Sequence, residues 1–176
     1  MAAGIESKKI TPDTTFVDTG SVTLNKKTIE NWDGKANGKQ PMRSVLELSI
    51  NTGAVFAEQK TGHDIFYNYL AKFGFAEQTG VTLPGEVRGN INNLKNGKEI
   101  DFATAAFGQG IAVTPIEMIN AFAVFANGGK LMQPMIIEKE KPKMIRQGIT
   151  QKTAETITDM LVGVVRRNKI ADIAKY

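Results

Sequence analysis

The chain has 176 residues, 41% hydrophobic and 23% charged, which is typical of one globular domain or a large part of one. Its 22 basic and 18 acidic residues give a net charge of +4 that is spread along the sequence. No basic run is interleaved with aromatic residues, so nucleic-acid binding is not expected. The absence of cysteine excludes disulfides, thiol catalysis and thiolate metal sites.

The first part of the chain predicts short strands and then helices. Residues 14–32 alternate between apolar and polar side chains around "DTGS" and "NKK", which predicts short strands. Residues 33–41 are turn formers and are expected to be an exposed loop. Ser44 and Glu47 have the spacing of a capping box, which predicts a helix start. A second helix is expected over residues 52–60.

The second part predicts three helices. Residues 64–73 carry an apolar stripe at helical spacing, and Gly74 is expected to end that helix. The glycine- and asparagine-rich residues 79–101 are expected to form loops and short strands. Thr114, with a proline and a glutamate behind it, predicts a helix to residue 126. A strand in "KLMQPMII" and a last helix over residues 151–166 complete an α+β chain that is mostly helical.

Several kinds of site find little support. His63 is the only histidine, and in "KTGHDIF" a solvent-exposed loop residue is favoured over a catalytic base. "GKANGK" has three residues between its glycines where a P-loop has four, and "GQGIAV" lacks the third glycine of a dinucleotide loop. A small nucleotide-binding protein is therefore the weakest of the functional alternatives. No carboxylate cluster has metal-ligand spacing, so neither a metal nor a cofactor is expected.

The stretch "LSINTG" at residues 48–53 places two polar side chains among apolar ones. Ser49 could pass a proton and Asn51 could hold a peptide group if both faced one cleft. Alternatively, Ser49 lies in the last turn of one helix and Asn51 caps the next. Spacing alone favours capping and leaves both interpretations open.

Longer stretches resemble a known family. "SINTG", "TGVTLPGEVRG" and "DFATAAFGQGIAVTPIEMINAFAVFANGGKLMQP" follow one another as in the transpeptidase domain of class B penicillin-binding proteins. "ITPDTTFVDTGSVTLNKKTIENWDGKANGK" resembles the segment behind the nucleophile helix, particularly in division-type members. The resemblance covers essentially the whole chain, and it is least distinctive in the last thirty residues.

The resemblance implies a D,D-transpeptidase that cross-links peptidoglycan stem peptides through a serine acyl-enzyme and is blocked by β-lactams. Its site combines S-x-x-K, S-x-N and K-T/S-G motifs. The middle motif matches Ser49-Ile50-Asn51. By this match, Ser49 is a proton relay, and Asn51 binds the substrate or the side-chain amide of an inhibitor.

The other two motifs have no match in these residues. None of the four serines has a lysine three residues on, and Thr23, which has Lys26, lies in a strand-like segment. Lys60-Thr61-Gly62 spells the third motif but is expected to close a helix. The chain is therefore interpreted as an internal part, 1–176, of one transpeptidase domain, between the nucleophile motif and the K-T/S-G strand. Such a piece has no nucleophile and is expected to be inactive by itself.

The resemblance also implies a penicillin-binding/serine β-lactamase-like fold that lacks most of its central sheet here. With its apolar faces left uncovered, this piece is expected to self-associate or to be partly disordered. The sequence has no apolar run of about 18 residues, and residues 1–9 lack the apolar core of a signal peptide. The parent protein is expected to be membrane-anchored, extracytoplasmic and in contact with cell-wall synthesis partners. The alternative is a non-catalytic, penicillin-binding-like interaction module.

Overall fold

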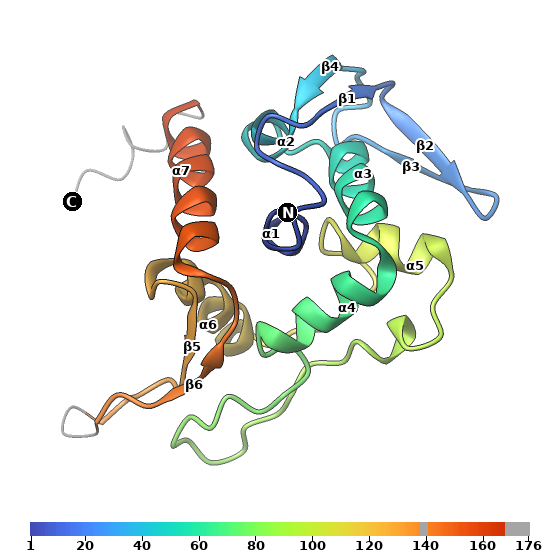
Figure 1. The fold of residues 1–176 in the computed structure, drawn as a ribbon. Helices are drawn as coiled ribbons and strands as arrows, with labels where there is room; N and C mark the ends of the chain where they lie inside the picture. The colour runs from blue at the N-terminus through green and yellow to red at the C-terminus, as the bar shows by residue number, and fades with distance from the viewer. Residues whose placement is uncertain (138–140, 168–176) are drawn as a thin grey trace.

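The computed structural model describes residues 1–137 and 141–167, and Figure 1 shows a mostly helical chain edged by hairpins. The helices are α1 (Ala2–Glu6), α2 (Met42–Glu47), α3 (Asn51–Thr61), α4 (His63–Lys72), a 3-10 turn η1 (Asn92–Leu94), α5 (Glu99–Ala105), α6 (Pro115–Ala126) and α7 (Gln151–Arg167). The strands are β1 (Thr15–Asp18), β2 (Ser21–Leu24), β3 (Lys27–Glu30), β4 (Gly38–Pro41), β5 (Lys130–Met132) and β6 (Met144–Gln147). The prediction of a mostly helical α+β chain is confirmed.

All strands of the described residues belong to antiparallel pairs. The pairs are β1 with β4, β2 with β3, and β5 with β6. The expectation of an exposed loop over residues 33–41 is wrong for its last part, because β4 pairs with β1 from Gly38 opposite Asp18 to Pro41 opposite Thr15. The pairing satisfies the backbone groups of β1 that face β4, and the Phe16 side chain of β1 is buried. No larger sheet occurs among the residues that the structure describes.

The predicted capping box at the start of α2 is wrong. The helix begins at Met42, and its N-cap Pro41 makes no side-chain capping bond, so Ser44 lies inside the helix. The free N–H groups of Met42 and Arg43 instead donate to backbone carbonyls of residues 14 and 12, at 2.9 and 3.0 Å. Met42 is fully buried, and this burial fixes the helix start two residues before the predicted cap.

The predicted start of α6 is confirmed, and its glutamate also contacts a distant loop. Thr114 Oγ1 accepts from Glu117 N at 3.2 Å, while Glu117 Oε2 accepts from Thr114 N at 2.7 Å. The other oxygen, Oε1, accepts from Gly89 N at 2.8 Å. Because Glu117 is 1% exposed, it fixes the long loop before α5 from inside the protein. The helix α5 was not predicted, since the turn-forming residues in front of it suggested loop and strand.

The core forms around α1, which lies in the middle of the chain in Figure 1 and contacts α3, α4 and α7. Gly4 is packed so closely that an added Cβ would lie 2.6 Å from Thr61 Oγ1. One buried cluster joins the start of the chain to α2 and α3 through Ile10, Phe16, Met42, Val45, Ile50 and Ala57. This cluster supports both sides of the α2–α3 turn. No described helix combines the length and the apolar character that crossing a membrane requires.

Candidate active-site turn

The turn between α2 and α3 closes with a specific hydrogen-bond pattern. The backbone N–H of Ser49 donates to Leu46 O at 3.3 Å, and that of Ile50 donates to Val45 O at 3.0 Å. Ser49 has φ of +54°, a conformation that helix ends usually give to glycine. Buried Ile50 and Val45 belong to one apolar cluster, as expected for this type of helix end. A serine therefore occupies a backbone position that glycine would fill at lower cost.

Ser49 and Asn51 flank a residue that faces the core. Ile50 is 2% exposed, whereas Ser49 is exposed and Asn51 half-buried. Within residues 1–137 and 141–167, the Ser49 hydroxyl makes no hydrogen bond. It is therefore available both as a donor and as an acceptor.

The capping interpretation of Asn51 is wrong. The N-cap of α3 is Ile50, and no side chain caps the helix. Asn51 Nδ2 instead donates to the backbone carbonyl of Glu30, at the end of β3, at 2.9 Å. A carbonyl can only accept, so this contact fixes which end of the amide faces β3. One Nδ2 hydrogen and Oδ1 remain without partners among the described residues.

A buried carboxylate lies behind this turn. Asp18 is 1% exposed, and its Oδ1 accepts from Thr52 Oγ1 at 2.6 Å and from Gly20 N at 2.9 Å. Its Oδ2 accepts from Asn31 Nδ2 at 2.8 Å, and from Asn37 N and Nδ2 at 2.8 and 2.7 Å. Burial acts to raise the pKa of Asp18, but the hydrogen bonds from Thr52, Asn37 and Gly20 outweigh it and lower the pKa to about 2. The carboxylate is therefore charged, and no described cation pairs with it.

Asn31 connects this carboxylate to the start of α3. Its side chain is buried, and its Oδ1 accepts from Thr52 N at 3.2 Å. Its Nδ2 donates to Lys35 O at 2.9 Å as well as to Asp18. Adjacent residues at the end of β3 thus hold adjacent residues of α3, with Glu30 on Asn51 and Asn31 on Thr52.

Sequence reasoning missed the group formed by Asp18, Asn31 and Thr52. The alternation around "DTGS" predicts only a strand and turn region. The Asp-x-Gly spacing does predict the local bond from Gly20 N to the aspartate. The four donors other than Gly20 come from residues 31, 37 and 52, and only the fold brings these to residue 18.

The expectation of a solvent-exposed loop histidine is wrong about the loop, although the side chain of His63 is 41% exposed. His63 is the first residue of α4, its ring stacks on Phe102 at 4.1 Å between centroids, and its Nδ1 lies 2.8 Å from Glu58 Oε1. Burial raises the pKa of Glu58, and the hydrogen bond and charge of His63 only partly oppose it. This pair belongs to the end of α3 remote from Asn51. No group of three potential metal ligands occurs within the described ranges.

The triplet Lys60-Thr61-Gly62 closes α3, as predicted. Thr61 is the last helical residue and its Oγ1 donates to Ala57 O at 2.6 Å. Gly62 follows with φ of +88°. Thr23 lies in β2 and Lys26 in the turn behind it, so that pair is not carried by a helix either.

Comparisons with known proteins show the family to which the chain belongs. Residues 1–175 match the family described as penicillin binding protein transpeptidase domain. The chain is 30% identical to stage V sporulation protein D of Bacillus subtilis over 94% of its length, and 31% identical to penicillin-binding protein PbpB of Mycobacterium tuberculosis over 95%. The crystal structure of penicillin binding protein 3 from Mycobacterium tuberculosis has a TM-score of 0.83 and 29% identity over 93% of this chain. The same protein complexed with aztreonam has a TM-score of 0.81 at 28% identity.

The fold is therefore that of a penicillin-binding transpeptidase. The chain belongs to the transpeptidase domain family of class B penicillin-binding proteins. It spans 28% and 26% of the lengths of the two curated relatives, and 39% of the crystallised protein.

Proposed function

We propose that this chain is part of a peptidoglycan D,D-transpeptidase and contributes the S-x-N corner of its site. The observation that carries the proposal is the outward presentation of the Ser49 hydroxyl and the Asn51 amide on either side of buried Ile50. Relatives of the chain are named peptidoglycan D,D-transpeptidases, which supports this reaction class. The alternative that both residues serve as helix caps fails for Asn51.

The two residues have different roles in this proposal. Ser49 passes a proton between the attacking serine, its lysine and the amine that leaves or enters, because a free hydroxyl both donates and accepts. Asn51 holds the peptide group of the stem peptide with the polar atoms that β3 leaves free. Neither residue is the nucleophile. No cofactor is needed for acyl transfer by a serine.

The nucleophile and the K-T/S-G strand are proposed to lie outside residues 1–176. None of the four serines has a lysine three positions on, and Lys60-Thr61-Gly62 ends a helix. We therefore propose that the 176-residue chain is an internal part of one transpeptidase domain and does not acylate by itself. The proposed substrates of the complete protein are stem peptides, with β-lactams as inhibitors, and its proposed location is the outer face of the cell membrane.

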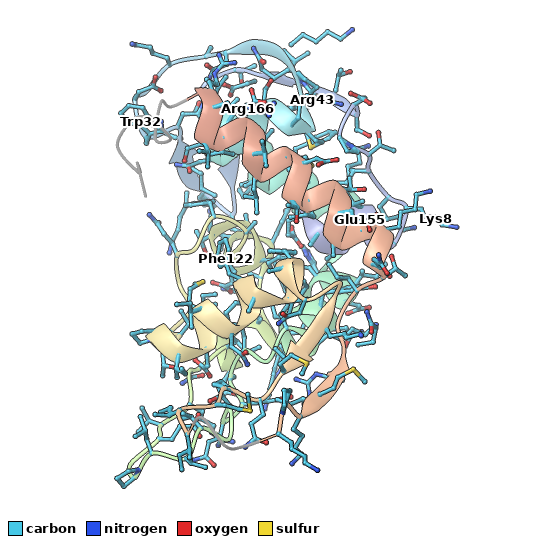
Figure 2. All side chains as sticks on the ribbon, turned by 90° about the vertical axis from the view of Figure 1, so that its left-hand side faces the viewer. Lys8, Trp32, Arg43, Phe122, Glu155 and Arg166 are labelled. Atoms are coloured by element: carbon cyan, nitrogen blue, oxygen red, sulfur yellow. The ribbon has the colours of Figure 1, made fainter. Side chains whose placement is uncertain are left out.

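Apolar side chains are exposed on α6 and on α7. Ile119 and Phe122 of α6 are 67% and 53% exposed, and Val162 and Val165 of α7 are 40% and 39% exposed. Figure 2 shows α7 above α6, which it contacts, and Phe122 is labelled just above α6. We propose that other parts of the complete domain cover this face, and that the 176-residue chain self-associates through it.

The test is covalent labelling by a fluorescent penicillin. The 176-residue chain is expected to remain unlabelled, and a longer polypeptide that includes S-x-x-K upstream and K-T/S-G downstream is expected to label. Labelling of the 176-residue chain would overturn its proposed inactivity. If the extended reading frame carries neither motif, the non-catalytic interaction module is favoured. A folded longer polypeptide that carries both motifs and fails to label would overturn the proposed enzyme.

A further inference from the structure

We propose that Asp18 is a positioning residue for Asn51, acting through Thr52 on α3 and through Asn31 at the end of β3. The contacts themselves do not depend on the proposed function; only the consequence for substrate binding rests on it. Among the described residues Asp18 makes no hydrogen bond to Ser49 or Asn51, so we assign it a positioning role and not a catalytic one.

The first step concerns the kind of side chain that the donors around position 18 require. Asp18 accepts five hydrogen bonds, from Thr52, Gly20, Asn31 and two donors of Asn37. Only a carboxylate offers enough lone pairs on two oxygens for such a set. An asparagine at this position would direct an N–H₂ group at the N–H groups of its neighbours. The burial of a charge without a cation is thus explained by the donors that surround it.

The second step concerns the first turn of α3. Thr52 is the second residue of this helix, and both its N–H and its hydroxyl are held, the first by Asn31 and the second by Asp18. The free N–H groups of a helix N-terminus favour an anion nearby, so the charge of Asp18 suits its place beside α3. Because Asn51 directly precedes Thr52, its backbone position is fixed by the same contacts.

The third step concerns the side chain of Asn51. Its Nδ2 donates to the carbonyl of Glu30, and the next residue, Asn31, is held by Asp18 at 2.8 Å. Asp18 thus fixes both the helix that carries Asn51 and the carbonyl that orients its amide. Movement of either element would rotate the atoms that face the substrate.

The test compares three variants, because Asp18→Ala leaves buried donors unpaired and can prevent folding. Thr52→Val removes the hydroxyl that donates to Asp18 while keeping the shape of the side chain. Thr52→Ser keeps the hydroxyl and is the rescue variant. Thr61→Val is the matched control, since it also removes a buried threonine hydroxyl from α3, at the end remote from Asn51.

The first readout uses the 176-residue chain and needs no activity. Nuclear magnetic resonance follows the two side-chain amide hydrogens of Asn51. Thr52→Val is expected to shift both signals and to speed their exchange with water about fivefold, the effect of weakening one hydrogen bond. Thr52→Ser and Thr61→Val are expected to leave them unchanged. Equal changes in Thr52→Val and Thr61→Val, or no change in Thr52→Val, would overturn the positioning role.

The second readout uses the longer polypeptide and the rate of its labelling by fluorescent penicillin. Thr52→Val is expected to slow labelling about tenfold or more, because small displacements of a substrate-positioning group are costly. Thr61→Val is expected to label at the unaltered rate even where its Tm falls equally. If the unaltered polypeptide does not label, the proposed function fails, while the resonance experiment still decides the positioning role. Equal rates in the two valine variants of a labelling polypeptide would overturn the inference.

Discussion

The side-chain nitrogen of Asn51 lies 2.9 Å from the backbone oxygen of Glu30, across the gap between α3 and the end of β3. This bond uses one of the two amide hydrogens and turns the rest of the amide away from the strand. The residue that directly follows Glu30 accepts from the residue that directly follows Asn51, at 3.2 Å. Two parallel contacts therefore fix the start of α3 to β3, and Asn51 can present its remaining polar atoms in one orientation.

Replacement of Ser49 separates stability from function. Ser49 has φ of +54°, which costs a residue with a Cβ about 1–2 kcal/mol. Glycine avoids this cost, but its greater conformational freedom in the unfolded chain offsets part of the gain. Ser49→Gly is expected to raise the Tm of the 176-residue chain by about 2 °C. Ser49→Ala keeps the strain and loses no hydrogen bond, so its Tm should not change. Differential scanning calorimetry of the two variants makes the comparison.

In the longer polypeptide, both Ser49 variants are expected to slow penicillin labelling because both lack the hydroxyl. A stabilised Ser49→Gly protein that labels at the unaltered rate would contradict the relay role. A lower Tm for Ser49→Gly would show that relief of the positive φ at this position does not stabilise the chain.

Local patterns predicted the elements whose signals lie within one segment. Thr114 and Glu117 cap the same helix that their spacing predicted, and Gly62 ends α3 as expected. The start of α2 failed because Met42 is buried against the rest of the fold, which no capping pattern records. The helix α5 was missed for a related reason: Ile100 and Ala103 bury into a cluster with Ile29 and Val55.

The candidate site shows the same difference between residues that a local motif predicts and residues that only the fold brings together. The positions of Ser49 and Asn51 were found from a motif only three residues long together with its flanking matches. The support behind them was not predicted, because four of the five donors to Asp18 belong to residues that follow it by 13, 19 and 34 positions in the chain. A charged residue in a strand-like segment is usually solvated, so its burial follows from the fold alone.

The charge of Asp18 should make stability depend on pH. Its pKa is lowered from 3.8 to about 2 in the fold, so its contribution is fully present above 3.8 and is lost as the pH falls toward 2. The contribution is about 2 kcal/mol at neutral pH, of which about 1 kcal/mol is lost at pH 3. Asp18→Asn removes this dependence, and the neutral side chain is expected to lower stability at pH 7.

Urea unfolding at pH 7, 5, 4 and 3 measures the difference between the original chain and Asp18→Asn. Far-ultraviolet circular dichroism of the helices follows unfolding, because the only tryptophan, Trp32, is 74% exposed in the fold and its fluorescence would change little. The difference in unfolding free energy is expected to shrink by about 1 kcal/mol between pH 5 and pH 3. A constant difference would mean that Asp18 is not ionised with a lowered pKa. Comparing the two proteins cancels the titration of the other carboxylates.

Glu58 should show the opposite behaviour. It is 3% exposed, its Oε2 has no hydrogen-bond partner among the described groups, and burial raises its pKa. When folding raises the pKa of an acid, the fold becomes less stable as the pH rises above the pKa of the acid in the unfolded chain, here 4.5. Glu58→Gln resembles the neutral acid and keeps an acceptor for His63. It is expected to stabilise the chain at pH 7, with a gain that disappears below pH 4.5.

The same urea experiment at pH 7 and pH 4 decides this prediction. Asp18→Asn and Glu58→Gln replace buried acids by their amides and serve as controls for each other. If Glu58→Gln destabilises the chain equally at both pH values, the contact with His63 is worth more than the burial of the charge costs.

The apolar face of α6 and α7 predicts association of the 176-residue chain. Phe122 and Ile119 are 53% and 67% exposed on one side of α6, and Phe122 also lines an apolar groove of 310 Å³ with residues of α1, α4 and α7. Phe122→Ser with Ile119→Ser replaces the two most exposed apolar side chains of this face. Burial of apolar surface in an interface contributes about 25 cal/mol per Å². Sedimentation velocity over a concentration series is expected to show a self-associating original chain and a monomeric double variant.

Val17→Ser is the control, because Val17 is equally exposed, at 68%, but lies on β1 beside α3. Association that survives the α6 double variant, or that is lost in Val17→Ser, would place the contact elsewhere on the surface.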